Sequence, residues 1–226
     1  MTDLKFTAYL EEFVTDNRKN LFKKVLAERT KHFTVVLEDL YQKHNWSAVA
    51  RSCDIFGIQD VYAIENKYHA HISNQVGKGS QQWIDLKRYK EKEHNTQDCI
   101  DDLRADGYQI IATTPHNEST FVSDFDVSKK SAFVFGVEKE GVSDLVMDQA
   151  DGYLKIPMVG FTESLNVSVA AAITLQNTTD RLKASDTPWQ LSQEEKDDIY
   201  LRWLESSIGS IKLIKERYYQ ENPEKE

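Results

Sequence analysis

The sequence predicts an α/β fold in which a mainly parallel sheet carries helices on both faces, with extra helices at the N- and C-terminal ends. Short apolar runs alternate with segments of helical periodicity between residues 31 and 183, and this alternation is typical of β-α-β units. The pattern changes after Lys183, where Asp186-Thr187-Pro188 interrupts the helical periodicity. We therefore expect a basic helical extension over residues 1–30, an α/β domain over 31–183 and a C-terminal helical extension over 184–226.

The first half of the chain gives helix and strand signals in turn. Leu21, Val25 and Leu26 follow helical spacing, and Asp16 or Asn17 could cap that helix. Gly57 is a natural residue to follow a helix C-terminus. The polar residues 66–94 give no clear assignment. We expect helices over Asp16–Glu28 and Asn45–Phe56, and strands over Phe33–Leu37 and Val61–Ile64.

The second half continues this alternation and ends in a long apolar stripe. The box Ser192–Glu195 has the composition of a helix N-terminus, and apolar residues at helical spacing run from there to about Tyr218. Such a stripe must be covered, either by the same chain or by a second subunit. We expect a helix over Thr96–Ala105, a strand over Gln109–Thr113, an apolar strand that begins near Ser131, a short helix, a strand over Tyr153–Ile156 and a buried helix over Val167–Leu175.

Two strand ends and one helix start are predicted to converge. Gly136, Glu138 and Gly141 form G-x-E-x-x-G directly after a buried strand, and glycine allows backbone to approach a ligand closely. Pro157 ends the next strand, since proline has no N–H to donate to a sheet. The loop Ser164-Leu165-Asn166 then leads into a helix. Such ends leave backbone N–H and C=O groups unpaired, so a small polar ligand could be held there largely by main chain.

The composition limits the class of protein. A chain of 226 residues is long enough for one domain with appendages. No run of about 18 apolar residues could span a bilayer, and the start MTDLKFTAYLEEF lacks the layout of a signal peptide. Cys53 and Cys99 are expected to be buried thiols rather than a disulfide, so a reducing cytoplasmic location without membrane contact is expected.

The net charge of −9 argues against indiscriminate nucleic-acid binding but leaves room for a local basic face. Residues 18–31 contain six cations and the single acid Glu28, so this segment is either a phosphate-binding face or a solvated helix. A second group, residues 87–92, is interrupted by acids and is expected to be solvated. The cations of the first segment are Arg18, Lys19, Lys23, Lys24, Arg29 and Lys31.

Several familiar site patterns are absent. Gly77-Lys78-Gly79 lacks the leading glycine and the final Ser or Thr of a phosphate-binding P-loop. No G-x-G-x-x-G follows the first strand, which removes the usual dinucleotide fingerprint. His69 and His71 have no convincing set of further ligands, so no metal site is expected.

Three ordered motifs resemble those of a known family. In the run His44–Cys53, Asn45, Ala48 and Arg51 take the family's conserved positions, the second motif is Phe135–Gly141, and the third joins Ile156–Met158 to Ser164–Ala170. Together they resemble the signature of SpoU-type RNA 2′-O-methyltransferases of the SPOUT superfamily, over about residues 17 to 183. The HNxSA form of the first motif and the terminal helical extensions resemble the TrmH-type branch, although Thr114 stands where a His is common and Trp46 is bulkier than usual.

This resemblance implies a function and a set of site residues. The function is methyl transfer from S-adenosylmethionine to the ribose 2′-oxygen of guanosine 18 in the D-loop of tRNA, without a metal. The implied structure has a C-terminal trefoil knot and forms a homodimer, which places first-motif residues near the partner's cofactor. The implied catalytic residues are Arg51, Asn45, Glu138, Ser164 and Asn166, the cofactor-binding residues are Thr113, Gly136, Ile156 and Leu165, and the candidate RNA-binding residues are Arg18, Lys19, Lys23, Arg29 and Lys31.

Two alternatives stay open on the sequence alone. The same chemistry could act on another RNA site, such as the tRNA wobble position or ribosomal RNA. The chain could also be a non-catalytic RNA-binding protein of the same fold that uses the basic segment alone. Taken singly, Arg51 could be a surface ion-pairing residue, Asn45 a helix cap and Glu138 a loop carboxylate. Only their joint arrangement in the three motifs favours the methyltransferase.

Overall fold

The computed structural model describes residues 3–67, 79, 82–115, 119–137 and 140–222. The chain divides into two compact units. The α/β unit comprises Thr30–Trp189, and the terminal helical unit comprises the residues up to Arg29 together with those from Gln190 onwards. Within the described residues, no helix combines the length and apolar character that crossing a membrane requires.

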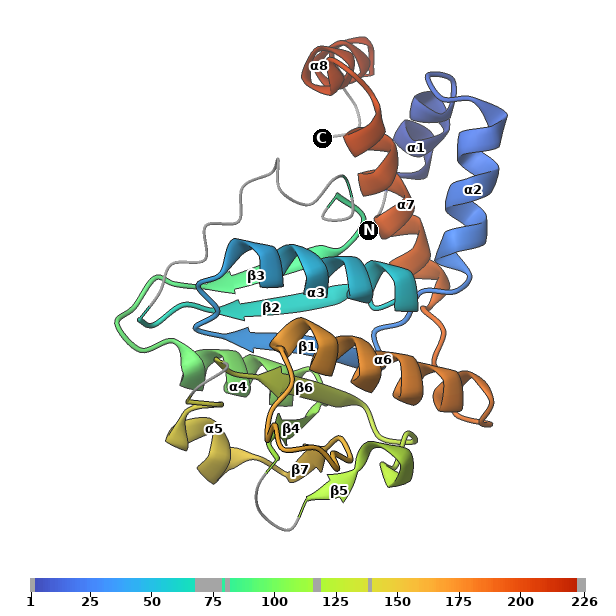
Figure 1. Ribbon diagram of the computed structural model, residues 1–226. Coiled ribbons are helices and arrows are strands. Elements are labelled where there is room, and N and C mark those ends of the chain that lie inside the picture. The colour runs from blue at the N-terminus through green and yellow to red at the C-terminus, as the bar shows by residue number, and fades with distance from the viewer. Residues whose placement is uncertain (1–2, 68–78, 80–81, 116–118, 138–139, 223–226) are drawn as a thin grey trace. The chain divides into compact units, whose positions relative to one another are not determined.

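The α/β unit is built on one seven-stranded sheet with the strand order β3-β2-β1-β6-β4-β7-β5 (Figure 1). Each strand pair in the described sheet is parallel, which confirms the predicted parallel arrangement. The strands are β1 (Phe33–Glu38), β2 (Asp60–Ile64), β3 (Asp85–Tyr89), β4 (Gln109–Thr113), β5 (Thr120–Phe121), β6 (Ser131–Phe135) and β7 (Gly152–Lys155).

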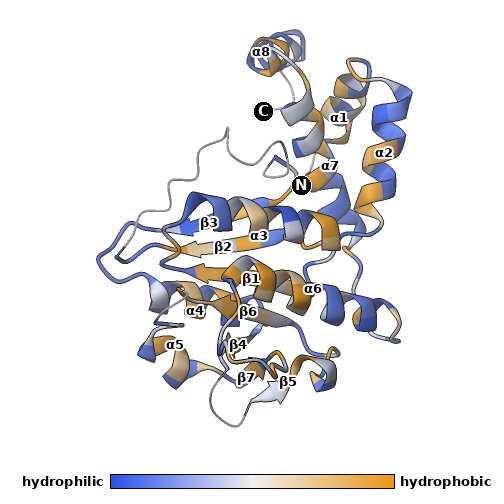
Figure 2. Ribbon diagram, in the orientation of Figure 1, coloured by the Kyte–Doolittle hydropathy of each residue, from blue (hydrophilic) through white to orange (hydrophobic). Residues whose placement is uncertain are grey.

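Helices cover both faces of this sheet, as the sequence predicted. Helices α3 (Lys43–Phe56) and α6 (Val167–Lys183) lie side by side over one face, while α4 (Thr96–Ala105) and α5 (Asp144–Gln149) cover the other (Figure 1). Side chains of β1 alternate between the two cores, because Val35 and Leu37 pack towards α3 and α6 whereas Val36 packs towards α4. Burial on both faces explains why the central strands read as continuous apolar runs (Figure 2).

Several element boundaries differ from those expected. Helix α2 (Asp16–Leu26) is capped by Thr15, whose side chain accepts a hydrogen bond from the Arg18 N–H at 3.3 Å, and not by Asp16 or Asn17. Helix α6 continues to Lys183 instead of stopping near Leu175. Its expected all-round burial is wrong, because Val169 and Ile173 are exposed on one face.

Strand β3 lies in the polar segment that gave no assignment. It pairs with β2 at the edge of the sheet, where charged side chains are well tolerated. Arg88 makes two hydrogen bonds to the buried Glu65 carboxylate, from Nε to Oε1 at 2.6 Å and from Nη2 to Oε2 at 3.0 Å. Lys87 lies 3.6 Å from an Asp106 carboxylate oxygen, so much of the second basic group is paired with acids.

The terminal helical unit packs its own apolar stripes together. Helices α1 (Leu4–Glu11) and α2 pack against α7 (Gln193–Ser207), with the Phe22 and Trp203 ring centroids 5.5 Å apart. The expected single C-terminal helix is broken, because Ser210 takes a left-handed φ of 58° before α8 (Ile211–Glu221). Much of the apolar stripe is therefore covered within this chain, including Ile199, Trp203 and Leu204.

Candidate functional site

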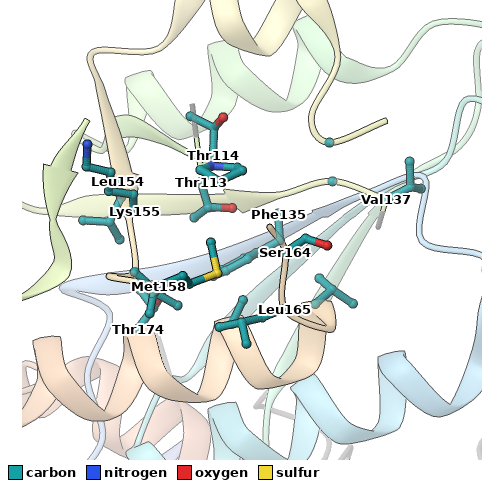
Figure 3. Close-up of a pocket in the computed structure, with 16 residues that line it drawn as sticks. Thr113, Thr114, Phe135, Val137, Leu154, Lys155, Met158, Ser164, Leu165 and Thr174 are labelled. Atoms are coloured by element: carbon teal, nitrogen blue, oxygen red, sulfur yellow. The ribbon is translucent and has the colours of Figure 1, made fainter. Parts of the chain in front are cut away.

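A cavity lies at the carboxyl ends of three neighbouring strands, β4, β6 and β7. Parallel α/β sheets commonly place ligands at this edge. Figure 3 shows side chains from these strand ends and from the loop before α6 gathered around one space. Its walls include all four residues expected at the cofactor site, Thr113, Gly136, Ile156 and Leu165, together with Ser164.

The first wall of the cavity is the loop after β6. The Val137 N–H donates to the Gly141 carbonyl at 3.1 Å, and the Gly141 N–H donates back to the Val137 carbonyl at 2.9 Å. A Cβ on Gly136 would lie 1.9 Å from the Gly141 carbonyl oxygen, so only glycine fits there. Gly141 itself has a φ of +73°, which favours glycine. Glu138 lies outside the described residues.

A buried carboxylate supports this loop from the end of β1. Glu38 Oε1 accepts hydrogen bonds from the hydroxyls of Thr96 and Ser143, each at 2.8 Å, and Oε2 accepts from the Ser143 N–H at 2.8 Å. Ser143 also caps α5, so Glu38 holds the chain just beyond Gly141. The sequence analysis did not identify Glu38, although a carboxylate ending an apolar strand was an available signal.

The second wall is formed by the ends of β4 and β7. The Thr113 hydroxyl donates to the Val134 carbonyl at 2.8 Å and the Thr114 N–H donates to the Leu154 carbonyl at 3.0 Å, so the three strand ends are tied together. Residues 156–166 then run without helix or strand. Their main chain is available to contact a ligand, as the sequence predicted, between apolar side chains such as Leu154, Met158 and Leu165.

The third wall is the start of α6, where a chain of side-chain amides links two motifs. Asn166 caps α6, since its Oδ1 accepts from the Ser168 N–H at 2.9 Å and from the Ser168 hydroxyl at 2.5 Å. Asn166 Nδ2 donates to Asn45 Oδ1 at 3.1 Å, and Asn45 Nδ2 donates to Gln42 Oε1 at 2.8 Å. The first and third motifs therefore meet within one chain.

Arg51 does not join the cavity of its own chain. It is exposed on α3 and is not among the residues that line the cavity. Six residues separate it from Asn45, which places the two side chains about 120° apart around the helix. Ile55, one turn further on the same face as Arg51, is 65% exposed. The structure thus joins Asn45 to Asn166 by a hydrogen bond and places Ser164 in the cavity wall, while Arg51 makes no part of that wall.

The candidate RNA-binding residues divide by environment. Arg18 and Lys23 are exposed on α2, and Lys19 Nζ lies 2.7 Å from an Asp16 carboxylate oxygen. Lys31 is partly buried, with its Nζ 3.9 Å from Asp60 Oδ2. The expectation that Arg29 lies on an RNA-binding surface is wrong, because Arg29 is 1% exposed and its guanidinium lies 5.3 Å from the centre of the Trp203 ring.

The remaining expectations about special residues have mixed outcomes. Cys53 and Cys99 are free and buried, as predicted, and burial raises the pKa of the Cys99 thiol. Residues 77 and 78 of the rejected P-loop pattern, and both His69 and His71, lie outside the described residues. The cavity is also lined by Phe135, Val137 and Met158, which lie in the quoted motifs but were not among the expected site residues. Their positions at or just after strand ends were the available signal.

Comparison with known proteins gives a consistent result. The model of the SpoU rRNA Methylase family matches residues 32–176. A tRNA (guanosine(18)-2′-O)-methyltransferase of Borreliella burgdorferi is 39% identical over 211 residues, which cover 93% of this chain and 95% of that protein. The Thermus thermophilus protein of the same name is 34% identical over 193 residues, which cover 84% of this chain and 97% of that protein. The crystal structure of an A. aeolicus TrmH/SpoU tRNA modifying enzyme superposes with a TM-score of 0.75 at 29% identity, covering 86% of this chain and 98% of that one.

Proposed function

The chain belongs to the SpoU rRNA Methylase family, and from this premise we propose that it is the methyltransferase of the ribose 2′-oxygen of guanosine 18 in tRNA. The observation that carries the proposal is the convergence of Thr113, Gly136, Ile156 and Leu165, which come from three separate segments, on one cavity. That cavity lies beside the Asn45–Asn166 contact between the first and third motifs. The methyltransferase reaction needs these two sites, one for a methyl donor and one for a ribose, next to each other.

The cavity fits S-adenosylmethionine as the donor. Leu154, Ile156 and Leu165 offer apolar walls for an adenine ring, and the irregular main chain of residues 156–166 offers N–H and C=O groups for its polar edge. The tight Gly136–Gly141 loop closes one side of the space. When bound, this cofactor supplies a methyl group already activated by its sulfonium.

The protein's own task is to align the ribose and to manage charge. Arg51 stays protonated under ordinary conditions, so it is a poor base. Its proposed role is to hold an RNA phosphate and to stabilise negative charge that builds on the 2′-oxygen, while the proton leaves to a phosphate or to water. Asn45 and Asn166 hold the loop that carries Ser164 at the cavity. Glu138 is assigned a pairing role with Arg51 or Asn45 from its motif position alone.

A homodimer would bring Arg51 to a cavity. Arg51 and Ile55 lie on the exposed face of α3, and Val169 and Ile173 lie on the exposed face of the neighbouring helix α6. Exposed apolar side chains gathered on packed helices commonly mark a protein interface. We assign this face to a second copy of the chain, so that Arg51 acts in the partner's cavity. The trefoil knot remains a prediction from the family resemblance.

The proposed tRNA contact lies on α2 of the terminal helical unit. Arg18 and Lys23 are exposed there, and Lys19 and Lys24 add charge to the same helix. These residues would bind phosphates and so fix the RNA without reading its sequence. Arg29 is left out of this surface because it is buried against Trp203. A tRNA substrate supports the proposed cytoplasmic location.

The deciding experiment is a map of 2′-O-methyl marks in total RNA from a strain that lacks this protein. We expect the mark at guanosine 18 of tRNA to disappear and to return when the purified protein and S-adenosylmethionine are added. Loss of a mark at the wobble position or in ribosomal RNA would instead assign the chemistry to that site. No binding of S-adenosylmethionine at millimolar concentration in calorimetry would favour the non-catalytic RNA-binding protein.

A further inference from the structure

Gln42 occupies a position where a different residue would serve helix stability better. It is the N-cap residue of α3, and its side chain makes no capping hydrogen bond to that helix. Ser, Thr, Asp and Asn are the residues that cap well, because their short side chains reach the free N–H groups of the first turn. The Gln42 side chain instead bonds to Asn45 and, through Nε2, to the Tyr41 hydroxyl at 3.3 Å. Departures from a local rule of this kind are concentrated at functional sites.

The hydrogen bonds that link Gln42, Asn45, Asn166 and Ser168 run in one direction, which is set by the Ser168 backbone N–H. The Ser168 backbone N–H can only donate, so Asn166 must turn its carbonyl oxygen towards Ser168 and its amide nitrogen towards Asn45. Asn45 must therefore turn Oδ1 towards Asn166, which leaves its own Nδ2 facing Gln42. Gln42 Oε1 accepts from this Nδ2 at 2.8 Å, which fits this order.

Burial makes this order matter. Asn45 is 2% exposed, so an amide turned the wrong way would leave buried polar atoms without partners at a substantial cost in free energy. Asn166, at the other end, is exposed and lies in the chain between Leu165 and Val167, both of which line the cavity. The orientation of Asn45 therefore decides whether the loop at the cavity is held in one place.

We propose that Gln42 is a positioning residue for methyl transfer, which holds the Asn45 amide so that its oxygen anchors Asn166 at the cavity. This role rests on the proposed function, since it assigns a purpose to the Asn45–Asn166 contact in that reaction. The required property of residue 42 is an oxygen acceptor at the reach of a glutamine side chain. Charge is not required, and neither is the bond to Tyr41.

The test compares variants that separate the acceptor from the size of the side chain. Gln42→Met keeps the length and removes the acceptor, and Gln42→Glu keeps an acceptor oxygen. We expect Gln42→Met to lower kcat roughly five- to tenfold, the worth of about one hydrogen bond, with the KM for S-adenosylmethionine changed less than about twofold. Gln42→Glu should recover most of the rate. Tyr41→Phe, the matched control, should leave the rate unchanged because it spares the Asn45 bond.

Two further measurements keep the outcome clear. In an Asn45→Ala background, Gln42→Met should cause no additional loss, because a positioning residue acts through Asn45. In nitrogen-15 NMR spectra of the protein without donor or RNA, the side-chain amide signals of Asn45 and Asn166 should move in Gln42→Met and stay in place in Gln42→Glu. An unchanged rate in Gln42→Met, or additive losses with Asn45→Ala, would overturn the proposal. Amide signals that do not move in Gln42→Met would overturn the proposal about Gln42. A wild-type protein that methylates no tRNA would reject the proposed function, and the NMR result would still decide whether Gln42 orients Asn45.

Discussion

In the proposed homodimer, Asn45 and Arg51 of one chain are predicted to serve different active sites. Asn45 Oδ1 accepts from Asn166 of its own chain at 3.1 Å. Arg51 is exposed and lies about 120° around α3 from Asn45, on the side away from its own cavity. Each active site would then use Asn45 from the chain that forms the cavity and Arg51 from its partner.

Mixed dimers measure this directly. When one chain carries Asn45→Ala and the other carries Arg51→Ala, one of the two sites lacks both residues and the other keeps both. We therefore expect about half of the wild-type rate. When one chain carries both substitutions and the other is wild-type, each site lacks one residue. The site without Arg51 should lose about 10²- to 10³-fold in rate. The site without Asn45 loses the hydrogen bond to Asn166, so this dimer should fall well below half of the wild-type rate.

The assay uses chains with two different affinity tags, purified in tandem so that only mixed dimers remain. Initial rates of methyl transfer from S-adenosylmethionine to tRNA are compared with those of a doubly tagged wild-type dimer. Mass spectrometry before and after the assay checks that subunits have not exchanged. Arg104→Ala, which removes an arginine near α5 on the other face of the sheet, is the control for loss of a cation and should keep most of the activity.

The reverse result would refute the reasoning. If both residues act in their own chain, or both act in the partner's cavity, the mixed dimer of two single variants is nearly inactive. The dimer of the double variant with wild-type then keeps about half of the rate. Only a division of the first motif between two sites gives high activity in the first mixed dimer and low activity in the second. A monomeric, fully active enzyme would contradict the prediction as well.

Three further predictions test other parts of the site. Gly136→Ala should destabilise the protein by about 1–3 kcal/mol in urea unfolding and abolish donor binding in calorimetry, because its Cβ would collide with backbone at 1.9 Å; wild-type affinity would contradict this. Lys23→Ala should weaken tRNA binding and reduce the slope of log K against log salt by up to about one, whereas Lys90→Ala, an equal change of charge on another exposed residue, should leave the slope unchanged. Burial lowers the pKa of His32 in the folded protein, so the unfolded chain binds a proton more readily. The free energy of unfolding should therefore fall as the pH drops through and below about 6.5. Urea unfolding at pH 7.5 and pH 5 should show a smaller fall in His32→Gln than in the wild-type protein.

Much of the fold was predictable because its signals are local. The central strands β1 and β6 are largely apolar runs, β6 ends at Gly136, and burial on both faces preserves the apolar signal along the whole strand. Strand β3 could not be found in this way, since its stability comes from pairing with β2 and from contacts such as Arg88 with Glu65. The break between the last two helices falls at Ser210, directly after Gly209, which is a weak point in a helical stripe and was an available sequence signal.

Site residues could also be predicted where their position depends on nearby sequence, and could not where it depends on distant residues. Gly136 and Gly141 were predicted because a turn in that place needs glycine for reasons contained in the turn itself. Arg29 was misplaced because its burial depends on Trp203, which is far away in the sequence. Arg18 and Lys23 also lie over aromatic rings but stay exposed, so the burial of Arg29 could not be predicted from its residue type.

The six-position spacing of Asn45 and Arg51 in the first motif determines how the two side chains are arranged around α3. Once residues 43–56 are helical, a separation of six positions turns Asn45 and Arg51 about 120° apart, whatever the rest of the chain does. Asn45 is buried and its oxygen is committed to Asn166, so rotation of the helix cannot bring Arg51 to the same cavity without breaking that bond. If both residues take part in one reaction, we propose that the second comes from another copy of α3. The exposed Ile55, Val169 and Ile173 lie on the two helices where that copy would have to pack. The helix, the Asn45–Asn166 bond and the six-residue spacing taken together therefore support the proposed homodimer.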